Sequence, residues 1–129
     1  MAIDYILYLT RKDAPVVSPR PLVWVSASPE TEPSITYTEE EYGIRPTFGA
    51  LLRPDKWHQD EARAEVASLV GEILRQADDD ALLLYNGELP VLRRSAGRVV
   101  VSTRSPWAIY QELDRFSLPV EVEDLGGVT

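Results

Sequence analysis

Two tight-turn signals between residues 78 and 102 constrain the fold of this chain more than any other feature of its sequence. Three apolar runs, 81–85, 89–92 and 98–102, are separated by Asn86-Gly87 and by Ser95-Ala96-Gly97. Asn-Gly is a strong signal for a two-residue β-hairpin because both residues tolerate a positive φ. The stretch therefore predicts a three-stranded antiparallel meander, and its leucines and valines predict that the meander belongs to the core.

A long amphipathic helix is predicted before the meander, over about residues 56–77. Its apolar residues recur at helical spacing: Ala62, Val66, Leu69, Val70, Ile73, Leu74 and Ala77. Asp55, which follows Pro54, is placed to cap the first free N–H groups of this helix. We expect the meander to cover the apolar stripe, while the opposite stripe, with Glu61, Glu65 and Glu72, faces water.

The N-terminal part of the chain predicts shorter elements. Period-two alternation indicates a strand at 3–9 that lies inside a sheet, because both of its faces carry large apolar groups. Apolar runs predict further strands at 21–27, with Trp24 as its anchor, at 34–43, with Ile35 and Tyr37 on one side, and at 44–54. Five prolines make the segment 11–33 irregular and exclude a long helix there.

The C-terminal part predicts a short helix over about 106–116. Ser105 is its expected N-cap and Pro106 its first residue. Its expected packing side is formed by Trp107, Ile109 or Tyr110, Leu113 and Phe116. A strand fragment and a loose tail at 124–129 follow. Residues 1–129 are thus expected to form a single α+β domain, in which a mainly antiparallel sheet of about five to seven strands is covered on one face by the two helices.

The amino-acid composition offers few side chains that could act in catalysis. The 129 residues include no cysteine and one histidine, His58, which excludes disulfides, thiol catalysis and metal sites built from thiolates or several histidines. No phosphate-binding glycine loop or nucleophile elbow is present. We therefore expect no catalysis, no cofactor and no metal. The N-terminus has no basic signal region and no apolar run approaches ~20 residues, so we expect a cytoplasmic protein without membrane contact.

The net charge of −8 is concentrated in the middle of the chain, where residues 54–88 include three basic and nine acidic residues. Such a balance disfavours nucleic-acid binding and favours a cationic protein partner. The candidate protein-binding residues are Trp57, Glu61, Glu65, Glu72, Asp78 and Asp79, with Tyr42 as a second possible aromatic anchor. A plain solvated helix face, and core positions for the two aromatic residues, remain the alternative interpretation.

Two further charged groups have open roles. The run 78–80 lacks the alternating ligands and the glycine of a calcium-binding loop, which favours a solvated connection. The cluster Arg93, Arg94 and Arg98 either binds an anion or protects a sheet edge from aggregation.

Two segments resemble the SitI-type immunity proteins, the cytoplasmic antidotes of bacterial swarm-inhibition toxins. They are "GIRPTFGALLRPDKW" at 43–57 and "DDALLLYNGELPVLRRSAGRVVVS" at 79–102, and the similarity extends over about 1–10 and 43–115. The resemblance implies a non-enzymatic protein that binds and neutralises a cognate toxin, as a monomer or homodimer. The alternative from the residues alone is an assembly subunit that self-associates through an uncovered sheet face. A third hypothesis is an enzyme that uses two carboxylates in a pocket.

Overall fold

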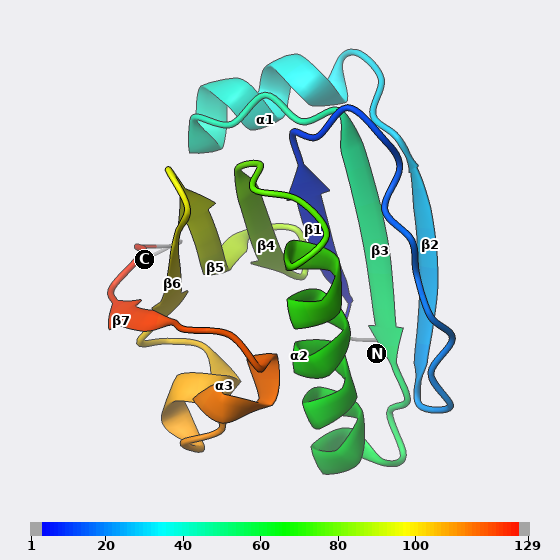
Figure 1. The fold of residues 1–129 in the computed structure, drawn as a ribbon, viewed down its shortest axis with the longest axis vertical. Coiled ribbons are helices and arrows are strands. Elements are labelled where there is room, and N and C mark those ends of the chain that lie inside the picture. The colour runs from blue at the N-terminus through cyan, green and yellow to red at the C-terminus, as the bar shows by residue number, and fades with distance from the viewer. Residues whose placement is uncertain (1–3, 127–129) are drawn as a thin grey trace.

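The computed structural model describes residues 4–126 and contains one seven-stranded sheet with helices on both faces (Figure 1). In chain order the elements are β1 (Tyr5–Leu9), β2 (Val23–Pro29), α1 (Ser34–Tyr42), β3 (Phe48–Pro54), α2 (Gln59–Leu74), β4 (Ala81–Tyr85), β5 (Leu89–Ser95), β6 (Arg98–Ser102), α3 (Pro106–Ile109), the 3₁₀ helix η1 (Leu113–Phe116) and β7 (Glu121–Glu123). The strand order is β2-β3-β1-β4-β5-β6-β7, and every neighbouring pair except β6–β7 is antiparallel. The predicted α+β class is confirmed.

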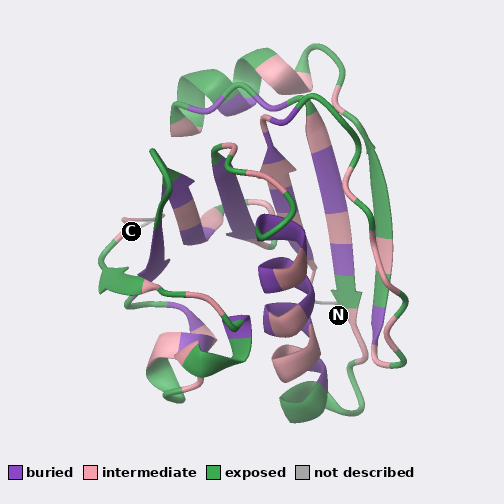
Figure 2. Ribbon diagram, viewed as in Figure 1, coloured by how far each residue is buried: buried purple, intermediate pink, exposed green. Residues whose placement is uncertain are grey.

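The first strand lies in the middle of the sheet, as its two apolar faces predicted. β1 pairs with β3 on one side and with β4 on the other, so that Leu7 lies opposite both Ala50 and Leu83. Tyr5, Leu7 and Leu9 are buried under α2. Figure 2 shows this region as the buried centre of the molecule.

The predicted long helix is present but shorter than 56–77. Its N-terminus shifts to residue 59 because Asp55 closes a turn: its carboxylate accepts the Trp57 N–H at 2.8 Å and its carbonyl accepts the His58 N–H at 3.4 Å. Asp55 is therefore not the N-cap, a position that His58 occupies. All predicted stripe residues within the helix are buried, whereas Ala77, beyond its end, is half-buried.

The meander of β4, β5 and β6 forms where the turn signals predicted. Asn86 and Gly87 have φ of 51° and 75°, and Ala96 and Gly97 have φ of 52° and 78°. Positive φ at two consecutive residues gives the backbone twist that joins adjacent antiparallel strands. The β5–β6 turn has two residues, since Ser95 pairs with Arg98, whereas the β4–β5 turn has three, since Tyr85 pairs with Leu89. The conformational preferences of the turn residues therefore determine both connections between the strands of the meander.

The segment predicted as a strand at 34–43 is instead the helix α1. The spacing of Ile35 and Tyr37 suggested an alternating strand, but the Glu32 carboxylate accepts the Thr36 N–H at 2.9 Å and stabilises the first turn. Gly43, at φ 72°, ends the helix. α1 and the following Ile44 cover the face of the sheet opposite α2, where a second apolar cluster forms. The prediction that only one face is covered was therefore wrong.

The predicted packing position of Trp24 is wrong, and so is that of Ile109 or Tyr110. Trp24 is 55% exposed, because the alternation of β2 directs it away from the α2 side. The predicted helix 106–116 is interrupted by Gln111, at φ 57°, and consists of α3 and η1. Ser105 caps α3 as predicted, and its hydroxyl accepts the Ala108 N–H at 3.2 Å. Trp107 and Phe116 are buried, but Ile109 and Tyr110 are each 62% exposed.

The C-terminal strand fragment is β7, and residues 124–126 follow it without regular structure. The rest of the predicted tail, 127–129, lies outside the described residues, as does residue 3 of the first predicted strand. Among residues 4–126, no helix combines the length and the apolar character needed to cross a membrane.

Candidate functional site

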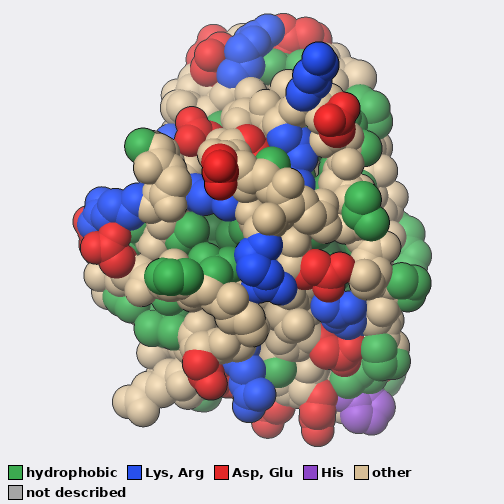
Figure 3. Space-filling model, in the orientation of Figure 1, with side chains coloured by type: hydrophobic (Ala, Val, Ile, Leu, Met, Phe, Trp, Pro, Cys, Tyr) green, Lys and Arg blue, Asp and Glu red, His purple; other side chains and the backbone are tan. Residues whose placement is uncertain are grey.

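The six predicted binding residues lie along α2 and beyond both of its ends, and they do not form one uniform surface. Trp57 and Glu61 are exposed near the start of the helix, Asp78 is exposed after its end, and Glu65 and Glu72 are half-buried along it. Asp79 has a side chain that is 9% exposed. Figure 3 shows blue basic groups between the red acidic groups on this face.

Asp79 is held in a cluster with two buried arginines, which we call the Arg11–Asp79–Arg94 cluster. One carboxylate oxygen lies 3.1 Å from Arg11 Nη2 and 2.9 Å from Arg94 Nη2. The other oxygen accepts the Thr10 N–H at 3.0 Å and Arg11 Nε–H at 3.2 Å. The arginine side chains are only 5% and 7% exposed. Both charges of the arginines are thus brought next to one enclosed carboxylate.

The same cluster provides hydrogen-bond donors for the last carbonyl groups of α2. Arg11 Nη2 donates to the carbonyl of Ile73 at 3.0 Å, and Arg94 Nη1 donates to that of Leu74 at 2.6 Å. The last carbonyls of a helix have no partner within the helix and carry partial negative charge, so cations stabilise them. The cluster therefore connects the end of β1, the end of α2 and β5. Asp79 is a structural residue in this arrangement and adds no exposed negative charge.

Glu72 is engaged by the proline-containing segment that precedes β2. Its two carboxylate oxygens accept the Ser18 hydroxyl at 2.6 Å and Arg20 Nη2–H at 2.7 Å. One helical turn later, the Gln76 side chain accepts the Val16 N–H at 2.9 Å and donates to the Val16 carbonyl at 2.6 Å. These contacts hold the segment 16–20 against α2. The hydrogen bonds from Ser18 and Arg20 lower the pKa of Glu72 below its usual value.

We expect Glu72→Gln to destabilise the protein in a pH-dependent way. The lowered pKa means that the charged carboxylate stabilises the folded state above the unfolded pKa of about 4.3, and that this stabilisation is lost as pH falls through the lower folded pKa. The variant should lose about 1 kcal/mol near pH 7 and almost nothing near pH 2. Urea unfolding at both values measures this, with the exposed Glu61→Gln as control. An equal loss at both pH values would contradict it.

The arginine cluster of the sequence is divided in the structure, because Arg94 is buried apart from Arg93 and Arg98. Arg94 belongs to the Arg11–Asp79–Arg94 cluster, and Arg93 Nη1 donates to the carbonyl of Tyr42 at the end of α1, at 2.7 Å. Arg98 pairs with Glu121 and Glu123 across β6 and β7. Arg93 and Arg98 line one small pocket together with Glu123, and the guanidinium group of each has an intramolecular partner.

Two of the exposed aromatic side chains, Trp57 and Tyr110, lie near the start of α2, in a region that we call the Trp57 corner. It consists of Tyr5, Lys56, Trp57, Gln59, Arg63, Tyr85 and Tyr110. Trp57 is 80% exposed, and Lys56 Nζ lies 5.1 Å from the centre of its ring. The Arg63 guanidinium lies 4.5 Å from the centre of the Tyr110 ring. This end of the molecule is the lower end in Figure 3, where acidic side chains and the single histidine also lie.

A pocket of about 250 Å³ opens beside Trp57, which does not itself line it. The Tyr5 and Tyr85 rings, which meet edge to face at 5.4 Å, contribute to its lining together with Lys56, Arg63 and Tyr110. Burial raises the pKa of the Tyr5 hydroxyl above its usual value. Arg63 is held by Glu112 at 2.7 Å and by Asp60 at 3.3 Å. The pocket therefore combines aromatic surface with fixed hydrogen-bonding groups, which suits the insertion of a protein side chain.

The corner shows little that would support catalysis. The His58 imidazole lies 3.4 Å from the Asp55 carboxylate and is mostly exposed. The hydrogen bond from the Trp57 N–H, helped by the His58 contact, holds the pKa of Asp55 below its usual value against the opposing effect of burial. Within the described range 4–126, no group of three or more His, Cys, Asp or Glu residues could hold a metal ion.

Sequence reasoning identified Trp57 but missed the other members of the corner. Tyr5, Arg63, Tyr85 and Tyr110 come from β1, α2, β4 and the end of α3, and no motif links them in the sequence. Tyr42, the second predicted anchor, is half-buried against the apolar cluster under α1, and its hydroxyl donates to the Glu88 carbonyl at 3.2 Å.

Comparison with known proteins gives one match. A family model described as SitI3-like matches residues 4–111, which include both segments that carried the resemblance. No curated protein and no solved structure matches the chain. The matched range extends from β1 to the end of α3, so it contains α2, the meander and every residue of the Trp57 corner.

Proposed function

Because the chain belongs to the SitI3-like family, we propose that it is an immunity protein that binds a cognate bacterial toxin and neutralises it without catalysis. A protein of this kind acts by occupying the surface that the toxin needs for its own activity. The residue inventory, with no cysteine and one exposed histidine, is consistent with a binding role. The cytoplasm is the compartment in which such an antidote would act.

The Trp57 corner is the toxin-binding surface that the geometry supports best. The observation that carries this proposal is the 80% exposure of Trp57 on a backbone held by the Asp55 carboxylate. A large aromatic side chain on an ordered turn loses little conformational freedom when a partner covers it, and tryptophan is enriched among residues that dominate interface energy. The neighbouring pocket offers a place for a side chain of the toxin.

Negative charge near the corner supports a cationic toxin surface. Glu61 is exposed in the first turn of α2, and Asp60, although paired with Arg63, has a side chain that is 87% exposed. Together with the net charge of −8, these groups would attract a basic partner and raise its association rate. Glu65 and Asp78 extend this charge along α2, whereas Glu72 and Asp79 are occupied by arginines of the same chain.

Co-expression with a candidate toxin from a neighbouring gene tests the proposed function. A cell that makes this toxin should grow only when the chain is present, and the two proteins should co-purify in a fixed ratio. The complex should weaken as salt rises and with Glu61→Lys, because both changes reduce electrostatic attraction. Growth without the chain, or no complex at low salt, would contradict the proposal.

Trp57→Ala should weaken toxin binding about 10- to 30-fold, which corresponds to about 1.4–2 kcal/mol, without changing the stability of the free protein. Tyr37→Ala is the matched control, because Tyr37 is a 58% exposed aromatic residue on α1. Calorimetric titration of each variant with purified toxin measures the effect. If the Tyr37 variant lost as much affinity as the Trp57 variant, the binding surface would not be the Trp57 corner.

An assembly subunit is the second candidate function, and one observation favours it: the edge strand β2 is exposed along most of its length. Recovery of self-oligomers alone, under conditions in which the toxin is present and folded, would support this alternative over immunity.

A further inference from the structure

The two edges of the sheet differ in length and charge. β7 has three residues, and its Glu121 and Glu123 pair with Arg98 of the neighbouring strand. β2 has seven residues, Val23–Pro29, none of which is ionisable, and positions 26–29 are exposed (Figure 2). Charged side chains and short length normally prevent an edge strand from pairing with another chain. β7 has both protections, whereas β2 has only a terminal proline.

The hydrogen bonds at the two ends of β2 show which of its backbone groups face outward. The Glu30 N–H donates to the Thr47 carbonyl at 2.9 Å, and the Asp55 N–H donates to the Leu22 carbonyl at 2.8 Å. Because bonded pairs alternate along an antiparallel ladder, the even-numbered residues of β2 direct their groups to β3. The N–H and C=O groups of Val25 and Ala27 therefore point away from the sheet, and no partner for them exists among residues 4–126.

The outward groups beyond these two residues are limited. Val23 is already engaged by a bridge with Arg20. Pro29 has no N–H and offers only its carbonyl. The open part of the edge is thus four groups on two residues, one N–H and one C=O on each of Val25 and Ala27.

We propose that two copies of this chain associate through β2, antiparallel and around a two-fold axis at Ser26. Val25 of one copy then lies opposite Ala27 of the second copy, and each pair exchanges two hydrogen bonds, so that all four open groups are satisfied. An axis at Ala27 would place Val25 opposite Pro29, whose missing N–H leaves the Val25 carbonyl unpaired. An axis at Val25 would place Ala27 opposite Val23, which Arg20 already engages.

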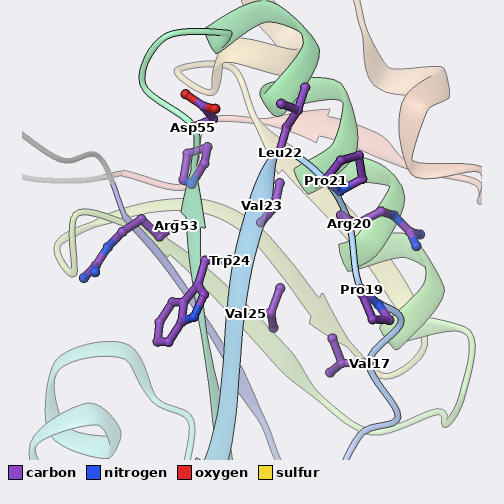
Figure 4. Close-up of a pocket in the computed structure, with 11 residues that line it drawn as sticks. Val17, Pro19, Arg20, Pro21, Leu22, Val23, Trp24, Val25, Arg53 and Asp55 are labelled. Atoms are coloured by element: carbon purple, nitrogen blue, oxygen red, sulfur yellow. The ribbon is translucent and has the colours of Figure 1, made fainter.

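The side chains beside β2 fit a second copy of the same strand. Figure 4 shows Val17, Val23 and Val25 on one side of the strand, and Trp24 and Arg53 on the other. The groove of about 680 Å³ along this edge is lined mainly by apolar residues. In the proposed register, Ala27 and Pro29 of the second copy lie on the valine side of this groove. Since β2 has no charge, the pairing brings no like charges together within the strands.

The absence of native cysteine allows a direct test of the register. Ser26 of the two copies would form a pair without mutual hydrogen bonds, with Cα atoms about 4.5 Å apart, which is within disulfide range. Ser28→Cys is the matched control, because the two copies of residue 28 would be offset by about four residues, or about 14 Å at about 3.4 Å per residue. Under mild oxidation, Ser26→Cys should convert mostly to a disulfide-linked dimer and Ser28→Cys should remain monomeric on a non-reducing gel.

Light scattering over a range of protein concentrations provides the second readout. The wild type should show a monomer–dimer equilibrium, and Ala27→Pro should raise its dissociation constant at least tenfold, because it removes an outward N–H and leaves the β3 ladder intact. If that variant does not fold, Ser26→Lys, with Ser28→Lys as control, introduces like charges at the axis.

A wild type that stays monomeric would overturn the proposal. Equal cross-linking of the two cysteine variants would overturn it as well, as would a dimer that both Ala27→Pro and Ser26→Lys leave unchanged. These outcomes are independent of toxin binding, because the dimer is measured with the purified chain alone, and the inference does not rest on the proposed function.

Discussion

Asp79→Ala should lower the free energy of unfolding by about 3–5 kcal/mol, because it leaves two buried arginines without their common carboxylate. Arg11 and Arg94 are almost completely enclosed, and each also donates to a terminal carbonyl of α2. The loss therefore includes both the desolvated positive charge and a weakened helix end.

The neighbouring Asp78→Ala is the matched control for this prediction. Asp78 is exposed and follows the same helix, so its replacement should change the free energy of unfolding by less than about 0.5 kcal/mol. Urea denaturation of both variants, monitored by circular dichroism, measures the difference. Similar stability of the two variants would mean that the Arg11–Asp79–Arg94 cluster does not contribute as its geometry indicates.

Gly71→Ala should destabilise the protein by about 3 kcal/mol, since overpacking of a close backbone contact is costly. A Cβ atom at this position would lie 1.9 Å from the Phe116 carbonyl oxygen and 2.9 Å from the Phe116 carbonyl carbon, both of which are backbone atoms. Within an exposed helix the same substitution would stabilise by about 1 kcal/mol. The expected sign is therefore opposite to the one that helix propensity predicts.

Ser68→Ala provides the comparison on the same helix. Ser68 is half-buried and lies one turn before Gly71, and its replacement should change stability by less than about 0.5 kcal/mol. Thermal unfolding of both variants tests the prediction. A Gly71→Ala protein as stable as the wild type would show that η1 can move away from α2 without loss.

Local patterns were sufficient for most elements of the fold but not for all of them. The turn residues of the meander, the apolar stripe of α2 and the Ser105 cap each act over a few neighbouring positions, and each was predicted. The segment 34–42 shows where such reasoning stops, because Ile35 and Tyr37 fit a strand as well as a helix. Its helical state depends on the Glu32 carboxylate and on the apolar surface of the sheet below it.

The candidate site depended more strongly on distant contacts. Asp78 and Asp79 are identical in type and adjacent, and only the positions of Arg11 and Arg94 decide that one is enclosed and the other exposed. The Trp57 corner is likewise built from elements that lie far apart in the chain. The meander, the long helix and the family resemblance could be predicted from the order of residues, because periodicity and turn chemistry are local. The tertiary structure alone decided which acids remain free, where the aromatic residues meet and which strand forms the open edge, because each of these depends on the pairing of distant segments.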